Sequence, residues 1–157
     1  MSYALYDGTL ATAINLYKFH KIRRLYRPLG KLLLGFDAAG IDAVVPVPLS
    51  LKGLRERGFN QSLLLARVVA GHNRKPLIMD RLIKDLDTHP QIGLSAKERA
   101  ANLKGAFSVR GDFRDMSLLL VDDVMTTGAT VSECSKQLLE AGAKKIVVLT
   151  LARASAL

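Results

Sequence analysis

The chain has 157 residues, of which 49% are hydrophobic and 24% charged, and its 23 basic and 14 acidic residues give a net charge of +9 at pH 7. This composition excludes a disordered chain, and the length suits one α/β domain. We find no apolar run near the roughly 18 to 20 residues that span a membrane, no secretion signal, and only one cysteine, Cys134. We therefore expect a cytoplasmic protein without membrane contact, disulfide or zinc site.

The first third of the chain predicts helices followed by a strand. Residues 8–35 have apolar stripes at helical spacing, and Pro28 and Gly30 predict a division or kink between two helical pieces. Residues 41–47 are apolar and rich in β-branched side chains, which predicts a strand that two prolines should end in a constrained loop.

The middle of the chain predicts two further helices around a strand and a long loop. Helical spacing runs through residues 60–70, with Asn60 as the expected N-cap. A short apolar run within 76–84 predicts a second strand. Residues 85–94 are polar and contain a proline and a glycine, which predicts a loop of a length that is often functional. A capping box at Ser95 predicts a helix to about residue 103.

The last third of the chain alternates between strands and a helix. We expect short strands at 106–109 and 118–121, a helix over 131–140, and a final strand at 145–151. Strands that alternate with helices predict a mainly parallel sheet that is covered on both faces.

The run LLLVDDVMTTGAT, at 118–130, has the strongest chemical signal. Asp122 and Asp123 follow the predicted strand, and the Thr-Thr-Gly sequence at 126–128 supplies hydroxyls, a flexible backbone and a helix start. Such a turn directs backbone N–H groups and the positive end of a helix dipole to one place. An anion site beside two carboxylates suits a sugar phosphate. The plain alternative is a strand–turn–helix unit with a threonine N-cap and solvated aspartates.

This run resembles the 13-residue phosphoribosyl pyrophosphate (PRPP) motif of the type I phosphoribosyltransferases. The resemblance implies that Asp122 and Asp123 are the catalytic pair, which holds the ribose 2′- and 3′-hydroxyls. It assigns the 5′-phosphate to the loop residues Thr126, Thr127, Gly128, Ala129 and Thr130. It also implies a three-layer α/β type I fold in a single domain, 1–157. A small helical hood (1–36) would precede a PRPP-binding core (37–157).

Two further stretches narrow the resemblance to the ComF/GntX branch, which is amidophosphoribosyltransferase-like. PVPL at 46–49 is followed by RGFNQ at 57–61, and a Q-x-x-L…R…N-x-x-G-A-F pattern lies within 91–107. Many members of that branch begin with a four-cysteine zinc ribbon, whereas the one cysteine of this sequence, Cys134, lies far downstream. We therefore expect either a short form or a truncated chain.

The resemblance also implies where the rest of PRPP would bind. The pyrophosphate contacts would come from the segment after the first core strand, where the candidates are Arg57, Lys52, Arg55 and Asn60. For Arg57 and Asn60, locking that segment to the sheet is a nearly equal alternative. A mobile loop would close over PRPP, with Lys84, His89 and Gln91 as candidates. We expect Mg²⁺ to bind through the pyrophosphate, and through water to Asp122 and Asp123.

Two functions remain open from the sequence. One is a phosphoribosyltransferase that transfers a phosphoribosyl group from PRPP to an unidentified acceptor. The other is a non-catalytic competence protein that binds PRPP or nucleic acid, with DNA or a competence-machinery protein as partner. Six basic residues and no acid lie between Lys18 and Lys31, which suits either polyanion, although a solvated helix face is the plain alternative. The same segment could form a homodimer contact.

Overall fold

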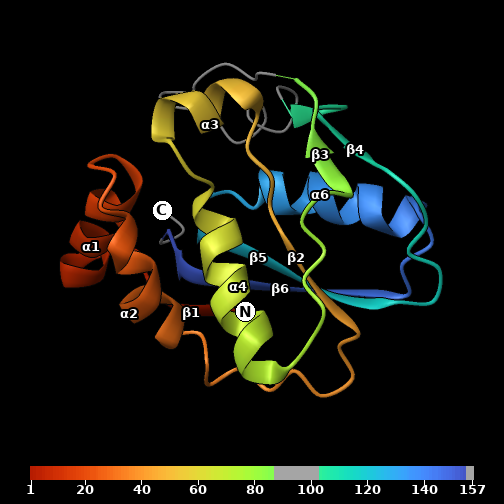
Figure 1. Ribbon diagram of the computed structural model, residues 1–157, viewed down its shortest axis with the longest axis horizontal. Helices are drawn as coiled ribbons and strands as arrows, with labels where there is room; N and C mark the ends of the chain where they lie inside the picture. Colours follow the sequence, from red (N-terminus) through yellow and green to blue (C-terminus); the bar gives the residue numbers. More distant parts are fainter. Residues whose placement is uncertain (87–102, 155–157) are drawn as a thin grey trace.

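The computed structural model describes residues 1–86 and 103–154 (Figure 1). In chain order the elements are β1 (Ser2–Leu5), α1 (Gly8–Lys18), the 3₁₀ helix η1 (Arg23–Leu25), α2 (Tyr26–Lys31), β2 (Ala43–Pro46), α3 (Leu51–Arg57), α4 (Gln61–Asn73), β3 (Leu82–Lys84), β4 (Phe107–Val109), β5 (Ser117–Met125), α6 (Ala129–Glu140) and β6 (Lys145–Arg153). No helix within the described ranges is long and apolar enough to cross a membrane.

A four-stranded parallel sheet in the order β1-β6-β5-β2 forms the middle of the molecule. The strand β5 is central, and its pairing with β2 ends where Val121 meets Pro46. On its other side β5 stays paired with β6 as far as Met125, which lies opposite Arg153. The last part of β5 therefore extends past the end of β2.

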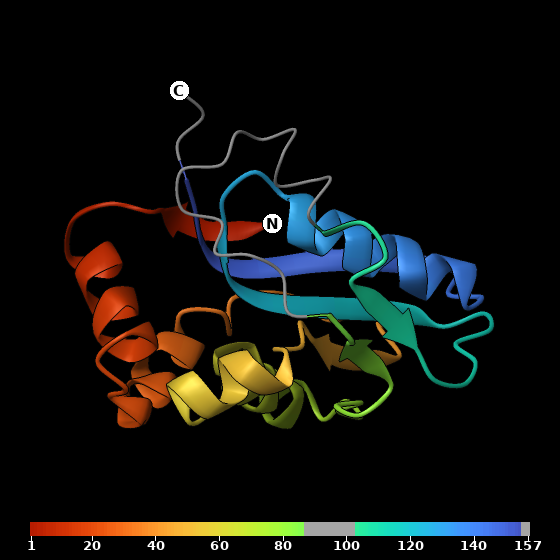
Figure 2. The ribbon, with the colours of Figure 1, turned by 90° about the horizontal axis from the view of Figure 1, so that it is seen from above.

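Helices cover both faces of this sheet (Figure 2). Successive side chains of a strand point to opposite faces. Leu119 of β5 packs in one core with Leu65 of α4, and Leu120 packs in a second core with Leu138 of α6. Because both faces are buried, the strand is apolar at consecutive positions. The predicted three-layer α/β architecture with a mainly parallel sheet is confirmed.

The N-terminal helices divide at a different place from the one expected. Pro28 and Gly30 both lie inside α2, and the break falls before η1, where Lys21 has a positive φ of 57°. Pro28 is tolerated because the first turn of a helix does not need its N–H. Gly30 allows α2 to approach α4, since a Cβ at that position would lie 2.9 Å from the Cβ of Val68.

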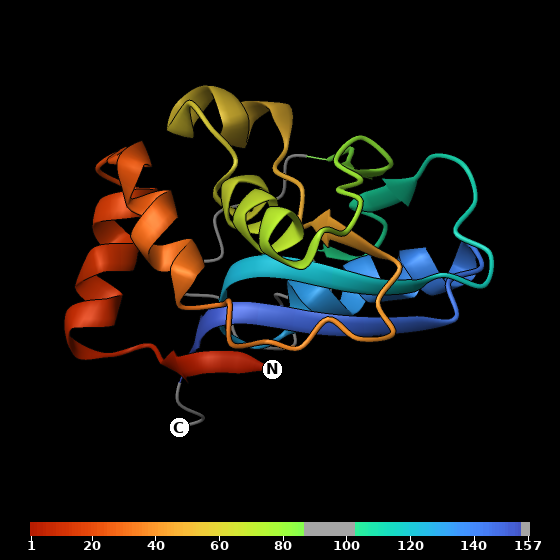
Figure 3. The ribbon, with the colours of Figure 1, turned by 60° about the horizontal axis from the view of Figure 1, so that its bottom comes forward.

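Three other parts of the fold differ from the sequence expectation. The edge strand β1, which lies beside β6 (Figure 3), was not predicted. The segment expected as a loop after β2 contains α3, which begins after Ser50, whose side chain accepts a hydrogen bond from the N–H of Gly53. Within 76–84 the structure has the strand β3, which pairs with β4 in a separate antiparallel sheet, and Leu77 forms an isolated parallel bridge with Val44 of β2. The helix expected over 95–103 falls almost wholly outside the described residues.

Candidate functional site

The two adjacent carboxylates lie inside β5, whereas the sequence had suggested that they follow the end of the strand. Because β6 continues to pair with β5 after β2 has ended, Asp122 and Asp123 sit in a strand with one neighbour. They are nevertheless 9% and 4% exposed, so the alternative of solvated aspartates is wrong. A buried carboxylate needs hydrogen bonds or an opposite charge, and each of the two has a partner from a different helix.

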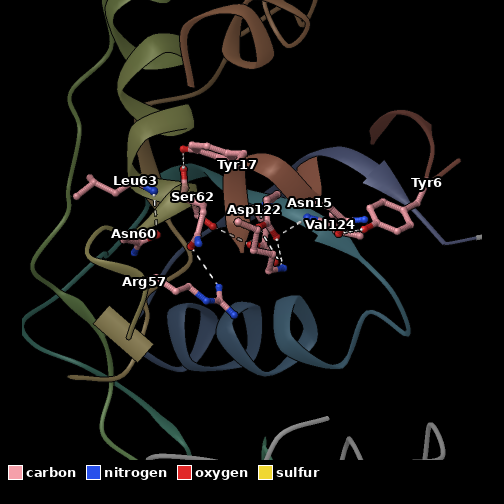
Figure 4. A network of polar contacts seen from close by, with 12 residues as sticks. Tyr6, Asn15, Tyr17, Arg57, Asn60, Ser62, Leu63, Asp122 and Val124 are labelled. Carbon is pink, nitrogen blue, oxygen red and sulfur yellow. Dashed lines mark hydrogen bonds and ion pairs between the residues drawn. The ribbon is translucent and has the colours of Figure 1, made fainter. Parts of the chain in front are cut away.

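Asp122 is held by the first turn of α4 (Figure 4). Its Oδ1 accepts a hydrogen bond from the Ser62 hydroxyl at 2.8 Å and one from the backbone N–H of Asp123 at 2.9 Å. Burial, with the nearby Asp123 carboxylate as a second cause, raises the pKa of Asp122 to about 6. This carboxyl group can therefore change its protonation state close to neutral pH.

Asp123 forms an ion pair with Lys18, the last residue of α1. The Lys18 ammonium lies 3.1 Å from each of the two carboxylate oxygens, and the N–H of Val124 donates to Oδ1 at 2.7 Å. In the sequence Lys18 belongs to the basic run, and no motif assigned it a role in the site. The run indicated a positive face, and no local pattern tells which lysine of such a face turns inward.

Asn60 connects the start of α4 to the end of the first core strand. Its side-chain oxygen accepts a hydrogen bond from the N–H of Leu63 at 3.1 Å, and its Nδ2 donates to the carbonyl of Val47 at 3.0 Å. The expected N-cap is confirmed. This amide therefore has a locking role, which was the alternative to a ligand contact.

Arg57 and Gln61 lie on either side of that cap. The Arg57 guanidinium donates to Gln61 Oε1 at 3.2 Å, while Gln61 is 1% exposed and its Nε2 has no hydrogen-bond partner. The Tyr17 hydroxyl donates to the Gln61 carbonyl at 3.0 Å, and the Tyr17 ring lies 5.3 Å from the ring of Phe59. These contacts tie α1 to the start of α4, and the same region holds both carboxylates.

The loop after β5 leads directly into α6. Gly128 is the N-cap of α6 with φ 79°, so neither threonine takes that position. The Thr127 hydroxyl accepts a hydrogen bond from the N–H of Ala129 at 3.4 Å, and Thr126 and Thr127 are both exposed. Thr130 follows Ala129 in the first turn of α6. The first N–H groups of a helix have no partner within it, so this turn suits an anion.

The remaining candidates are spread over other elements. Lys52 and Arg55 are exposed on α3. Lys84 ends β3, and its ammonium lies 5.6 Å from the centre of the Phe107 ring. His89 and Gln91 lie outside the described residues. Among the residues that are described, no group of three or more His, Cys, Asp or Glu side chains could hold a metal ion.

Comparisons with known proteins point to one family. Residues 65–156 match the phosphoribosyl transferase domain. Competence protein F of Haemophilus influenzae is 40% identical over 116 residues, which cover 72% of this chain and 51% of that protein. The DNA utilization protein YhgH of Salmonella typhi is 33% identical over 156 residues, which cover 94% of this chain and 69% of that protein. The chain thus spans about half of the first relative's length and about two thirds of the second's.

A solved structure supports the same grouping. The glutamine phosphoribosylpyrophosphate amidotransferase of B. subtilis, in complex with ADP and GMP, matches with a TM-score of 0.56 at 26% identity. The match covers 80% of this chain and 25% of that one.

Proposed function

The chain belongs to the phosphoribosyltransferase family, in the ComF branch of competence protein F, as the sequence motifs predicted, and on this premise we propose that it binds PRPP at the end of β5. We further propose that it transfers the phosphoribosyl group to an acceptor. In that reaction an acceptor nucleophile attacks C1 of the ribose. The bond from C1 to the pyrophosphate oxygen breaks, the pyrophosphate leaves with the electron pair, and the proton of the acceptor passes to solvent.

One observation supports this proposal above the others: two buried carboxylates lie a few residues before a helix whose N-cap residue, Gly128, has no side chain to cap it. Asp122 and Asp123 would accept hydrogen bonds from the ribose hydroxyls, since ionised carboxylates are pure acceptors. The loop from Thr126 to Thr130 would hold the 5′-phosphate on the first turn of α6. A ribose phosphate needs acceptors for its hydroxyls and N–H donors for its phosphate. The carboxylates and the first turn of α6 supply these groups a few residues apart.

The pyrophosphate would lie toward the basic end of α3. Arg57 is half-buried and hydrogen-bonded to Gln61, whereas Lys52 and Arg55 are exposed on the same short helix. The helix therefore offers one fixed and two exposed cations. Asn60 would act indirectly, because both ends of its amide already hold the backbone. A positive field here would stabilise the charge that develops on the leaving pyrophosphate.

The donor set fits Mg²⁺ that is carried by the ligand. One carboxylate of the pair is bonded to a serine and the other to a lysine, which leaves too few free oxygens for an all-protein metal cage. Mg²⁺ bound to pyrophosphate oxygens, with water between it and Asp122 or Asp123, would supply charge neutralisation of the leaving group. The protein residues would hold the ribose and exclude water around it.

The test is calorimetric titration of PRPP into the protein with Mg²⁺ present. We expect micromolar affinity, about −8 kcal/mol. Asp123→Asn should weaken binding while the circular dichroism spectrum stays that of the wild type. Absence of PRPP binding by the wild type at millimolar ligand overturns the proposal. Binding without release of pyrophosphate over a panel of acceptors would restrict the function to binding.

Nucleic-acid binding is a second candidate function, and one surface favours it. The five basic residues of the N-terminal run other than Lys18 are exposed, namely Lys21, Arg23, Arg24, Arg27 and Lys31. The three arginines of this set line a cavity of about 340 Å³ together with Tyr26. Fluorescence anisotropy with labelled single-stranded DNA tests this function. Binding that weakens steeply with added salt supports it, and absence of binding at low salt excludes it.

A further inference from the structure

Lys18 differs from every other basic residue of the N-terminal run. The other five are exposed, whereas the Lys18 side chain is 21% exposed and reaches the Asp123 carboxylate. We propose that Lys18 is a binding residue of the sugar-phosphate site, where it compensates the charge of Asp123 and keeps this carboxylate ready for a ribose hydroxyl. The inference rests on the proposed function, because it concerns the same site.

The position of Lys18 is fixed by its neighbours in α1. Tyr17 is fully buried and donates to the Gln61 carbonyl, and its ring packs against Phe59. Ile14, one turn earlier, is also fully buried in the core. The last turn of α1 therefore packs against the start of α4. Lys18 extends from this packed turn to the end of β5.

The hydrogen bonds at Asp123 leave room for a ligand while Lys18 stays in place. A carboxylate offers about four acceptor positions. Lys18 and the N–H of Val124 donate to Oδ1, and Oδ2 lies at ion-pair distance from the Lys18 ammonium. One position on Oδ2 remains for a hydroxyl. The lysine ammonium has three donors, and among the described residues it donates one hydrogen bond, to Asp123 Oδ1, so a donor is available for an oxygen of the ligand.

Lys18 has an electrostatic role at the site in addition to linking α1 to β5. Two adjacent buried carboxylates repel each other, and they would also repel a ligand that carries several phosphate charges. The lysine offsets one of these charges within hydrogen-bond distance, in a place where solvent screens little. Without it, Asp123 would be a buried carboxylate with no cationic partner among the described residues, and a polyanion would approach an uncompensated negative pair.

The test compares PRPP titrations of the wild type, Lys18→Met and Lys18→Arg, with Mg²⁺ present. Lys31→Met is the matched control, because Lys31 belongs to the same run but is exposed at the end of α2. We expect Lys18→Met to weaken PRPP binding about tenfold or more, as for loss of one partner in a buried charge pair. Lys18→Arg should recover most of that loss, and Lys31→Met should stay within about twofold of the wild type.

A purely structural role for Lys18 gives a different result. In that case Lys18→Met lowers the thermal midpoint but binds PRPP with wild-type affinity, and the proposal is overturned. If Lys18→Met does not fold, Lys18→Gln takes its place, since a glutamine can still donate to Asp123 without the charge. Equal PRPP affinity of a folded Lys18→Gln variant and the wild type also overturns the proposal. A wild-type protein that fails to bind PRPP overturns the proposed function itself, and this inference with it.

Discussion

The Ser62 hydroxyl donates a hydrogen bond to Asp122 Oδ1 at 2.8 Å, and it joins the first turn of α4 to the central strand across 60 positions of the chain. Both residues are buried, at 5% and 9% exposure. Since Asp122 lies in the part of β5 that has no β2 neighbour, this bond is one of the contacts that fixes the carboxyl group. The serine is therefore part of the site although it shows no chemical motif.

We predict that Ser62→Ala destabilises the protein by about 1 to 3 kcal/mol, because it leaves a buried carboxylate oxygen without a side-chain donor. Urea unfolding measures the change. Ser132→Ala is the control, since Ser132 is exposed on α6 and should shift the free energy of unfolding by less than about 0.5 kcal/mol. Equal effects of the two variants would contradict the role given to the Ser62 bond.

The raised pKa of Asp122 predicts a pH dependence of stability. The pKa is about 6 in the folded protein against 3.8 for the free side chain, so the folded state binds more protons between these values. Stability from this group is thus fully present below pH 3.8 and is lost as the pH rises through 6. The loss is at most about 3 kcal/mol.

This pH dependence is measured against Asp122→Asn, which cannot titrate at that position. Urea unfolding of both proteins from pH 4.5 to pH 7.5 should show that the wild type loses stability relative to the variant. Parallel pH profiles of the two proteins would mean that Asp122 has no raised pKa.

The sequence predicted the layers and the acid–loop motif because both depend on local patterns. The apolar run before Asp122 and the Thr-Thr-Gly turn are contiguous, and alternating elements fix the fold class. The contacts made by Lys18 and Ser62 were not predicted, since each depends on how a distant helix packs on β5. The true end of β5 was also missed, because pairing with β6 extends the strand through two acids that a local pattern assigns to a loop.

Gly128→Ala should weaken PRPP binding and destabilise the fold by about 1 kcal/mol. The residue has φ 79°, a conformation that an alanine adopts only with strain, and it begins the helix that would hold the 5′-phosphate. Calorimetry should show at least a tenfold loss of affinity. The control is Gly71→Ala within α4, where the added Cβ meets no atom within 4 Å. That change should leave affinity intact and stabilise the protein slightly.

Gly30→Ala should destabilise the protein by about 1 to 3 kcal/mol through overpacking. A Cβ at this position would lie 2.9 Å from the Cβ of Val68 on α4, which is too close for two carbon atoms. Val68→Ala in the same chain keeps that Cβ but removes both γ-methyl groups and lets the helices shift. The double variant should therefore recover part of the loss in a double-mutant cycle, and strictly additive effects would show that α2 and α4 do not meet here.

The variant Arg57→Ala distinguishes two roles of Arg57, namely a contact with the ligand and a structural contact with Gln61. If the guanidinium binds the pyrophosphate, its loss should weaken PRPP binding about tenfold, as for a hydrogen bond to a charged group. Ribose 5-phosphate has no pyrophosphate, so its affinity should change by less than about twofold. Arg67→Ala, at an exposed position of α4, is the control for loss of one positive charge. Equal weakening of both ligands would instead assign Arg57 to holding Gln61 and the start of α4, through the 3.2 Å bond between their side chains.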